Sequence, residues 1–242
     1  MLRTIFFYPC IIISLIYASI SYKIKTSFLC KKMNEKEKQI YIHKFTYNWS
    51  RFILKIAGAK VTVEGIDNIP NDKTILFVSN HQSNFDIPVL IGNIDVPKGF
   101  IAKKELESWP FISTWMKHIH CIFMDRSNMR KSAEAIVDGI KLLRSGYSMV
   151  VFPEGTRSKG GDIAEFKAGS FKLAIKSKCI IVPITINGTH KLLEANNNKI
   201  KSANIKLVIH DPIDVSTLPK EEINTLHETV KSIINKSYIR NK

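Results

Sequence analysis

Two short runs of the chain contain residue types that can move a proton and hold an anion. Residues 80–86 place His81 five positions before Asp86. An imidazole that is oriented by a carboxylate can take a proton from a hydroxyl group. Residues 152–158 place Arg157 in a Pro/Gly-containing loop, and a guanidinium can bind a phosphate through two parallel hydrogen bonds. Together the two runs predict transfer of a group onto an alcohol that carries a phosphate.

The second run offers further groups for the same chemistry. Glu154 can orient a substrate hydroxyl, and the backbone N–H groups near Gly155 and Thr156 can stabilise developing negative charge. Three cations elsewhere add to an anion site only if they converge on it. These are Lys103, Lys104 and Arg126, each of which follows a predicted strand.

Each run also has a purely structural interpretation. Residues 83–86 fit a variant of the capping box, in which Ser83 caps a helix and Asp86 satisfies its first turn. The run around Arg157 fits a surface turn with a local ion pair. On a continuous helix His81 and Asp86 would point about 140° apart. A shared pocket therefore requires a turn at His81 and a helix that begins near Ser83.

The pattern of apolar residues after residue 60 alternates between strand-like and helix-like segments. The predicted strands cover residues 60–64, 73–79, 99–102, 120–124, 148–152, 180–186 and 205–210. The predicted helices cover residues 84–92, 105–118, 129–145, 168–177 and 220–238. This alternation predicts an α/β domain over residues 60–242, a mixed sheet covered by helices, preceded by an N-terminal membrane-associated helical segment over residues 1–59. His81, Arg126 and the run around Glu154 all follow predicted strands, and that edge of an α/β sheet is where ligands bind.

The N-terminus begins with an uncharged, apolar segment. Residues 4–22 contain no charged side chain, and as a helix they would extend about 28 Å, close to the thickness of the hydrocarbon core. We expect a membrane anchor, with a cleaved secretory signal as the alternative. Basic residues follow at once, so the positive-inside rule places the catalytic domain on the cytoplasmic face. Those residues are Lys23, Lys25, Lys31 and Lys32.

A basic amphipathic stretch follows the apolar segment. Residues 23–60 carry ten Lys and Arg against two Glu. Apolar residues recur at helical spacing, namely Ile42, Phe45, Trp49, Phe52, Ile53 and Ile56. This stripe fits a helix in the headgroup layer of anionic lipid, and it equally fits an ordinary helix packed on the core.

The composition limits the classes of partner. The chain has 242 residues, 45% of them hydrophobic, a formal charge of +15 and a pI of about 9.6, which favours an ordered protein with an anionic partner. Anionic membrane lipids fit better than nucleic acid, because the charge concentrates beside the apolar segment and no nucleic-acid motif is present. The four cysteines, Cys10, Cys30, Cys121 and Cys179, are scattered, which favours reduced thiols over a disulfide framework or a zinc site.

Four ordered blocks of the sequence resemble the glycerol-phosphate acyltransferases of phospholipid synthesis, specifically the 1-acyl-glycerol-3-phosphate acyltransferase branch. Residues 80–86 match the NHxxxxD block, residues 122–126 resemble a second block, and residues 152–158 match a third. Val182, Pro183 and Ile184 resemble a fourth block, which is linked to the acyl-chain side. Residues 101–106 and 166–169 also resemble positions of this family.

The resemblance implies acyl transfer from acyl-CoA or acyl-carrier protein to the sn-2 hydroxyl of 1-acyl-sn-glycerol-3-phosphate, forming phosphatidic acid. His81 and Asp86 would be the catalytic pair, and Arg126 and Arg157, with Lys103 or Lys104, would bind phosphate. No metal or cofactor is expected beyond the thioester co-substrate. The alternatives are transfer to glycerol-3-phosphate or another lysolipid, and a non-catalytic, membrane-tethered lipid-binding protein. Ser113 and His120 stand where the family commonly has glycine, and neither the acyl carrier nor the oligomeric state follows from the resemblance.

Overall fold

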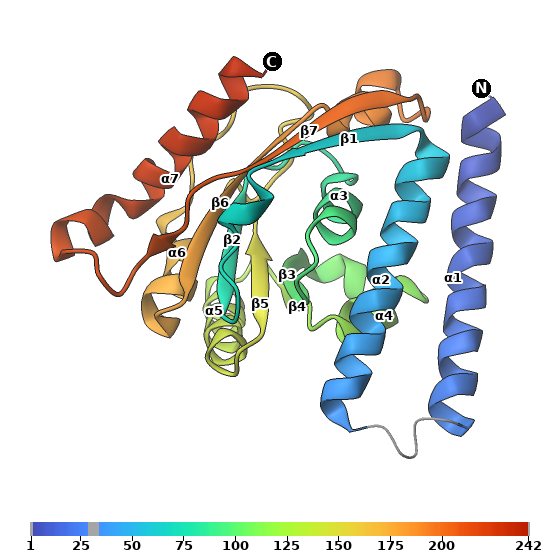
Figure 1. Cartoon of the computed structure of the whole chain (residues 1–242), viewed down its shortest axis with the longest axis horizontal. Coiled ribbons are helices and arrows are strands. Elements are labelled where there is room, and N and C mark those ends of the chain that lie inside the picture. The colour runs from blue at the N-terminus through green and yellow to red at the C-terminus, as the bar shows by residue number, and fades with distance from the viewer. Residues whose placement is uncertain (1, 29–33, 242) are drawn as a thin grey trace.

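The computed structural model describes residues 2–28 and 34–241. Three residues named above, Cys30, Lys31 and Lys32, lie outside the described part of the chain. The element order is two N-terminal helices followed by alternating strands and helices, as predicted from the apolar pattern (Figure 1).

The strands form one sheet in the order β1-β7-β6-β2-β5-β3-β4, with β8 paired to β6. Their bounds are β1 Ala59–Glu64, β2 Ile75–Ser79, β3 Lys98–Lys103, β4 Ile122–Met124, β5 Ser148–Val151, β6 Ile180–Asn187, β7 Ala203–Ile209 and β8 Ile213–Asp214. β2 pairs in parallel with β5 and β6, and β3 pairs in parallel with β4 and β5. β7 and β8 run antiparallel to β6, so the sheet is mixed, as predicted. The carboxyl ends of β2 to β6 therefore share one edge.

Helices cover both faces of this sheet (Figure 1). Their bounds are α1 Leu2–Phe28, α2 Glu35–Ala57, α3 Asp86–Asn93, α4 Ile112–His118, α5 Met129–Arg144, α6 Ala168–Ser177 and α7 Lys220–Arg240. The core on one face includes residues of α2 and α3, and the core on the other includes residues of α5, α6 and α7. The fold is thus an α/β layer arrangement in which the sheet is the rigid middle.

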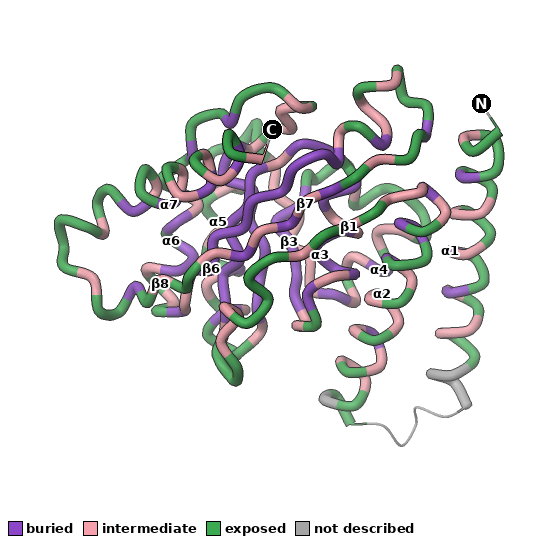
Figure 2. Tube along the Cα trace, turned by 45° about the horizontal axis from the view of Figure 1, so that its top comes forward, coloured by how far each residue is buried: buried purple, intermediate pink, exposed green. Residues whose placement is uncertain are grey.

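The central strand β2 has no polar face. Ile75 and Phe77 pack into the core beneath α2 and α3, whereas Leu76 and Val78 pack into the opposite core. All four side chains are fully buried, as expected for a parallel strand covered on both sides, and Figure 2 shows the sheet as the buried centre. Just beyond the strand, the Asn80 side chain bonds both backbone groups of Ile186, at 2.9 and 2.8 Å. The residue before His81 is therefore fixed in place.

The two N-terminal helices lie side by side and antiparallel (Figure 1). α2 begins at a capping box between Asn34 and Glu37 and ends at Gly58 in the left-handed conformation. Trp49 Nε1 of α2 donates to Ser14 Oγ of α1 at 2.9 Å, which joins the two helices. Trp115 Nε1 of α4 donates to Ser19 Oγ at 3.2 Å, so α1 is also fastened to the body of the protein.

The outer side of α1 is exposed and apolar. Leu2, Phe6 and Tyr17 are 73%, 63% and 71% exposed, and Figure 2 shows most of this helix uncovered. Residues 2–24 form the one helix, within the part of the chain that the structure describes, that is long and apolar enough to cross a membrane. Length and composition alone support that statement. On α2, by contrast, stripe residues such as Ile42 and Ile53 are buried in the core. This agrees with the alternative in which the stripe packs an ordinary helix on the core.

The helix predicted over residues 105–118 is wrong in one respect, because it is broken. A 3₁₀ turn spans Lys104–Ser108, and α4 begins only at Ile112. Pro110 has no N–H to donate and disfavours a helical conformation at Trp109. Phe111 then takes a φ of 62°, which a continuous helix does not allow.

Candidate active site

His81 and Asp86 meet through the loop that joins β2 to α3. β2 ends at Ser79 and α3 begins at Asp86, so the intervening residues form the turn that the spacing required. His81 Nδ1 lies 2.7 Å from Asp86 Oδ2. A carboxylate accepts, so this bond assigns the proton to Nδ1 and leaves Nε2 as the nitrogen that can take a proton. The imidazole also stacks on the Phe152 ring, with centroids 4.1 Å apart.

Asp86 is fully buried and is surrounded by donors. Besides the imidazole, Oδ2 accepts from the backbone N–H groups of Gln82 at 2.7 Å and Ser83 at 2.9 Å. Oδ1 accepts from Thr189 Oγ1 at 2.5 Å. A buried carboxylate is costly unless it is hydrogen-bonded, and these four donors offset that cost. Asp86 therefore orients His81 and bonds to the loop before α3. Ser83 is not the helix cap predicted from the sequence, because α3 begins at Asp86 with Phe85 as its N-cap.

Glu154 is buried, and its carboxylate bonds to the loop after β2 and to the loop after β5. Its Oε1 accepts from the backbone N–H of His81 at 2.6 Å, and its Oε2 accepts from the backbone N–H of Ala164 at 3.0 Å. The backbone N–H of Ser158 in turn donates to the His81 carbonyl at 2.8 Å. Burial raises the pKa of Glu154, and the two backbone bonds oppose that rise. The structure thus joins the run 152–158 directly to His81.

Arg157 is held close to the same loop by a carboxylate. Its Nη1 lies 3.0 Å from Glu194 Oε1, and the Glu194 side chain is only 5% exposed. Glu194 also accepts from Ser83 Oγ at 2.6 Å and from the Asn84 backbone N–H at 3.1 Å. One carboxylate therefore bridges the arginine and the loop that carries His81, which sets the position of the guanidinium.

Arg126 also reaches the run 152–158, where Nη1 donates to the Gly155 carbonyl. Burial lowers the pKa of Arg126, although an arginine keeps its charge at physiological pH. The Gly155 N–H is used in the turn itself, donating to the Phe152 carbonyl at 3.1 Å. An anion-stabilising role for the N–H of the next residue, Thr156, stays a prediction.

The two predicted lysines lie at the edge of this arrangement. Lys103 Nζ is 2.8 Å from Glu105, and Lys104 Nζ is 3.3 Å from Asp125, in exposed pairs. The second pair places Lys104 beside Arg126, because Asp125 precedes that residue in the chain. Exposed pairs of this kind are weak, so either lysine can exchange its partner for a substrate anion.

An apolar pocket of about 700 Å³ opens beside the loop that follows β5. Its walls include Ile101 of β3, Ile136 and Ile140 of α5, and Phe152, which stacks on His81. Arg126, Gly155 and Lys167 also line it, and further polar residues come from α5 and α6. The apolar part of its wall suits an apolar ligand, and five of its lining residues are cations, namely Arg126, Arg144, Lys167, Lys172 and Lys176.

The fourth block of the resemblance lies elsewhere. Val182 and Ile184 are fully buried on the face of β6 that packs with Phe77, whereas the pocket lies on the opposite face, with Val151. Pro183 lies between them and accepts from the His210 N–H at 3.0 Å. These residues build the centre of the sheet; their link to the acyl chain stays a prediction.

Two site residues were missed from the sequence. Thr189 follows β6 and reaches Asp86, and Glu194 pairs with Arg157. Thr189 carried a usable signal, because it is a polar residue directly after a predicted strand, like His81. Glu194 lies in an irregular segment with no such signal. In the described part of the chain, no group of three or more His, Cys, Asp or Glu could hold a metal ion.

Comparisons with known proteins show the family of the chain. A family model described as Acyltransferase matches residues 60–187, which include the loops after β2 and after β5. The chain is 33% identical to a 1-acyl-sn-glycerol-3-phosphate acyltransferase of Borreliella burgdorferi, over 76% of this chain and 73% of the relative. It is 32% identical to a probable enzyme of the same name from Mycoplasma genitalium, over 98% of this chain and 87% of the relative.

A solved structure extends the similarity to the N-terminal helices. The crystal structure of a 1-acyl-sn-glycerophosphate acyltransferase, PlsC, from Thermotoga maritima is similar to this one, with a TM-score of 0.85 and 29% sequence identity. The match covers 98% of this chain and 93% of the other, so α1 and α2 are part of the shared fold. With the buried Asp86–His81 pair in place and the family model spanning its surroundings, the chain belongs to the acyltransferase family.

Proposed function

We propose that this acyltransferase moves an acyl group from a thioester, acyl-CoA or acyl-carrier protein, to the sn-2 hydroxyl of 1-acyl-sn-glycerol-3-phosphate, forming phosphatidic acid. The observation that carries the proposal is the buried carboxylate Asp86 holding His81 at 2.7 Å, with Arg157 tied to the same loop through Glu194. A proton acceptor and a phosphate-binding cation thus lie on joined loops. The names of the relatives support this acceptor.

In the proposed reaction the acceptor hydroxyl is itself the nucleophile. His81 Nε2 takes its proton as the oxygen attacks the thioester carbonyl, and the new C–O bond gives a tetrahedral intermediate. Collapse of the intermediate breaks the C–S bond, and the thiolate leaves with the proton that the imidazolium returns. Asp86 stabilises the imidazolium and keeps Nδ1 protonated. Proton transfer of this kind contributes about 10²–10⁴-fold to the rate.

The acceptor phosphate is bound by Arg157 and Arg126. Glu194 occupies Arg157 in the structure and places the guanidinium beside the loop of His81. A phosphate can share the guanidinium with Glu194, because an arginine offers five N–H donors. The acyl chain of the donor would lie in the pocket between β3, β5 and α5, which Phe152 and Gly155 also line.

The exposed apolar side of α1 supports a location of this chemistry at a membrane surface. α1 is bonded along its length to α2 and α4, through Ser14 and Ser19, so it does not stand apart from the body as a separate crossing helix. We infer that its exposed apolar side lies in one leaflet, with the domain beside it on the cytoplasmic side. This arrangement brings a lipid acceptor and a water-soluble thioester to one enzyme.

The test is an assay of the purified full chain with labelled acyl-CoA or acyl-carrier protein against a panel of lysolipids and glycerol-3-phosphate. We expect 1-acyl-sn-glycerol-3-phosphate to be the preferred acceptor. His81→Ala should lower kcat by about 10²–10⁴-fold and leave sedimentation with vesicles unchanged. His227→Ala on α7 is the matched control. Preference for another acceptor would contradict the proposed substrate. Full activity of His81→Ala would contradict the proposed mechanism.

A further inference from the structure

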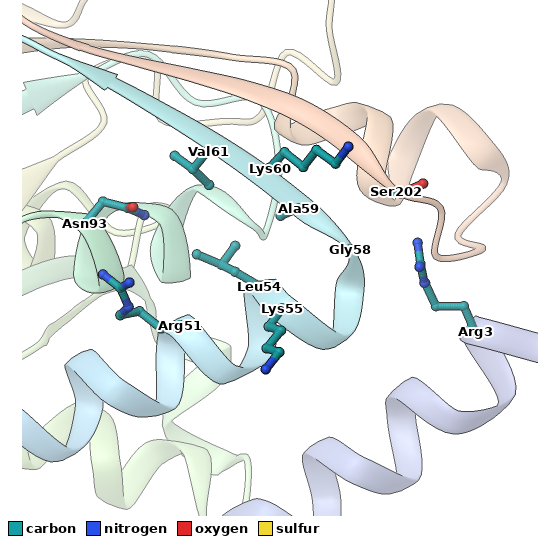
Figure 3. Close-up of a pocket in the computed structure, with 10 residues that line it drawn as sticks. All are labelled: Arg3, Arg51, Leu54, Lys55, Gly58, Ala59, Lys60, Val61, Asn93 and Ser202. Carbon is teal, nitrogen blue, oxygen red and sulfur yellow. The ribbon is translucent and has the colours of Figure 1, made fainter.

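A second, positively charged pocket lies where α1, α2 and β1 meet. Its volume is about 480 Å³, and Figure 3 shows its lining side chains, which come from α1, α2 and β1 and also include Asn93 of α3 and Ser202. Four of its lining residues are cations: Arg3 from the start of α1, Arg51 and Lys55 from the end of α2, and Lys60 from β1. The remaining lining residues are apolar or neutral, so no carboxylate lines the pocket.

The two arginines donate hydrogen bonds to neutral groups. Arg3 Nη1 donates to the Ala57 carbonyl at 3.5 Å, and Arg51 Nη1 donates to the Tyr47 hydroxyl at 3.2 Å. The acidic residues of α2, Glu35 and Glu37, lie in its first turn. The pocket is at the other end of this 23-residue helix, about 30 Å away. At that distance exposed charges are screened.

Helix capping explains only part of this charge. The carboxyl end of α2 carries about half a negative charge, which one cation balances. Gly58 caps the helix at a φ of +76°, and a Cβ there would lie 2.3 Å from Arg3 Nη1. The backbone shape thus leaves room for the guanidinium of Arg3 against the end of α2. The other three cations remain without a counter-charge in the pocket, which is a surplus that a bound anion would stabilise.

The surroundings of the pocket indicate which anion it takes. Arg3 lies at the start of α1 beside Leu2 and Phe6, which belong to the exposed apolar side of that helix. A ligand with a phosphate in the pocket and acyl chains along α1 would satisfy both surfaces. Asn93, at the end of α3, also lines the pocket, whereas Asp86 begins the same helix about 12 Å away. The pocket is therefore distinct from the catalytic pair.

We propose that this pocket binds the headgroup phosphate of an anionic membrane phospholipid, as a docking site separate from the acceptor site. The site does not depend on acyl transfer, so it can be tested in the His81→Ala background. The ligand for the test is short-chain dihexanoyl-phosphatidylglycerol, added below its micelle concentration to the full chain in a neutral detergent. Calorimetry gives the dissociation constant.

The decisive variant is Lys55→Gln/Lys60→Gln, and Lys44→Gln/Lys236→Gln is its control. All four lysines are exposed, and the two variants lose the same net charge. We expect the pocket variant to weaken lipid binding by about tenfold or more, and the control to bind as the parent does. Thermal unfolding of both variants checks that the fold is unchanged.

Three results would overturn the proposal. Equal weakening in the control would mean that general surface charge, not the pocket, attracts the lipid. Displacement by inorganic phosphate or by coenzyme A at the same concentration as the lipid would mean that the pocket holds a soluble phosphate. Unchanged binding by the pocket variant would place the lipid elsewhere. None of these results bears on the acyl-transfer assay, so the two proposals fail independently.

Discussion

Glu154 accepts a 2.6 Å hydrogen bond from the backbone N–H of His81, although the two residues are 73 positions apart. The bond crosses from the loop after β5 to the loop after β2, which are neighbouring parallel strands. Since its second oxygen is bonded to Ala164, Glu154 acts on the loops more than on the substrate. This differs from the hydroxyl-orienting role that the sequence suggested, and the difference can be measured.

We predict that Glu154→Gln lowers stability and kcat together. A glutamine amide has one acceptor oxygen, so one of the two backbone N–H groups loses its partner, at a cost of about 1–3 kcal/mol. Urea unfolding and steady-state kinetics measure the two effects. Glu165→Gln, an exposed residue on the same loop, is the control. Native stability with only a raised acceptor KM would instead support direct contact between Glu154 and the substrate.

Arg157→Ala should chiefly weaken binding of the acceptor. A charge-assisted hydrogen bond contributes about 1.5–3 kcal/mol, so we expect the acceptor KM to rise about 10–150-fold with a smaller change in kcat. Arg130→Ala is the control, because Arg130 is exposed and pairs only along its helix with Glu134. An unchanged acceptor KM would remove Arg157 from the phosphate site.

Thr189 is predicted to be a positioning residue for Asp86. Thr189→Val keeps the shape of the side chain but removes the donor to Oδ1, which leaves part of a buried carboxylate unsatisfied. We expect kcat to fall about 5–100-fold with little change in either KM, and Thr189→Ser to restore most of it. If the serine variant is as slow as the valine variant, packing and not the hydrogen bond is what matters.

Lys98 is predicted to make stability depend on pH. Its ammonium is buried and donates to the carbonyls of Ile94 and Val96 at 2.7 and 2.9 Å. Burial lowers its pKa from 10.5 to about 7, and nearby Asp95 opposes the shift. Between these values the unfolded chain binds one more proton than the folded one, so stability should rise with pH from about 7 to 10.5, by at most about 1.4 kcal/mol per unit.

The measurement is the urea midpoint of wild type and Lys98→Met at pH 7, 8 and 9. The variant leaves two carbonyls without a donor, so its absolute stability should be lower at every pH. The informative quantity is the slope, which should be steeper for wild type. Parallel slopes would mean that Lys98 stays charged in the folded protein.

The apolar pattern predicted most of the framework because buried parallel strands and amphipathic helices leave a clear period. Helix α6 has the predicted bounds, residues 168–177, and each predicted strand is present. The short strand β8, Ile213–Asp214, was not predicted, since two residues make no pattern. The helix predicted over residues 105–118 shows the opposite error. Its apolar residues keep a helical period through Pro110, but the backbone is not a continuous helix there.

Four residues of the candidate site could be singled out from the sequence, but Thr189 and Glu194 and the contacts of the site could not. His81, Asp86, Arg126 and Arg157 stood out because each combined reactive chemistry with a place after a strand. The partners that fix them come from distant segments: Thr189 lies 103 positions from Asp86, and Glu194 lies 37 positions from Arg157. Such pairs depend on strand order, which local sequence does not specify.

The bonds that fasten α1 to α2 and α4 determine how such an enzyme would find its substrates. With the helix in a leaflet, the body has no slack linker and stays at the bilayer surface. The lipid acceptor would then arrive by lateral diffusion in two dimensions, and only the thioester donor would be captured from solution. Encounter with the acceptor would scale with its surface density in the bilayer, whatever the volume of the cell.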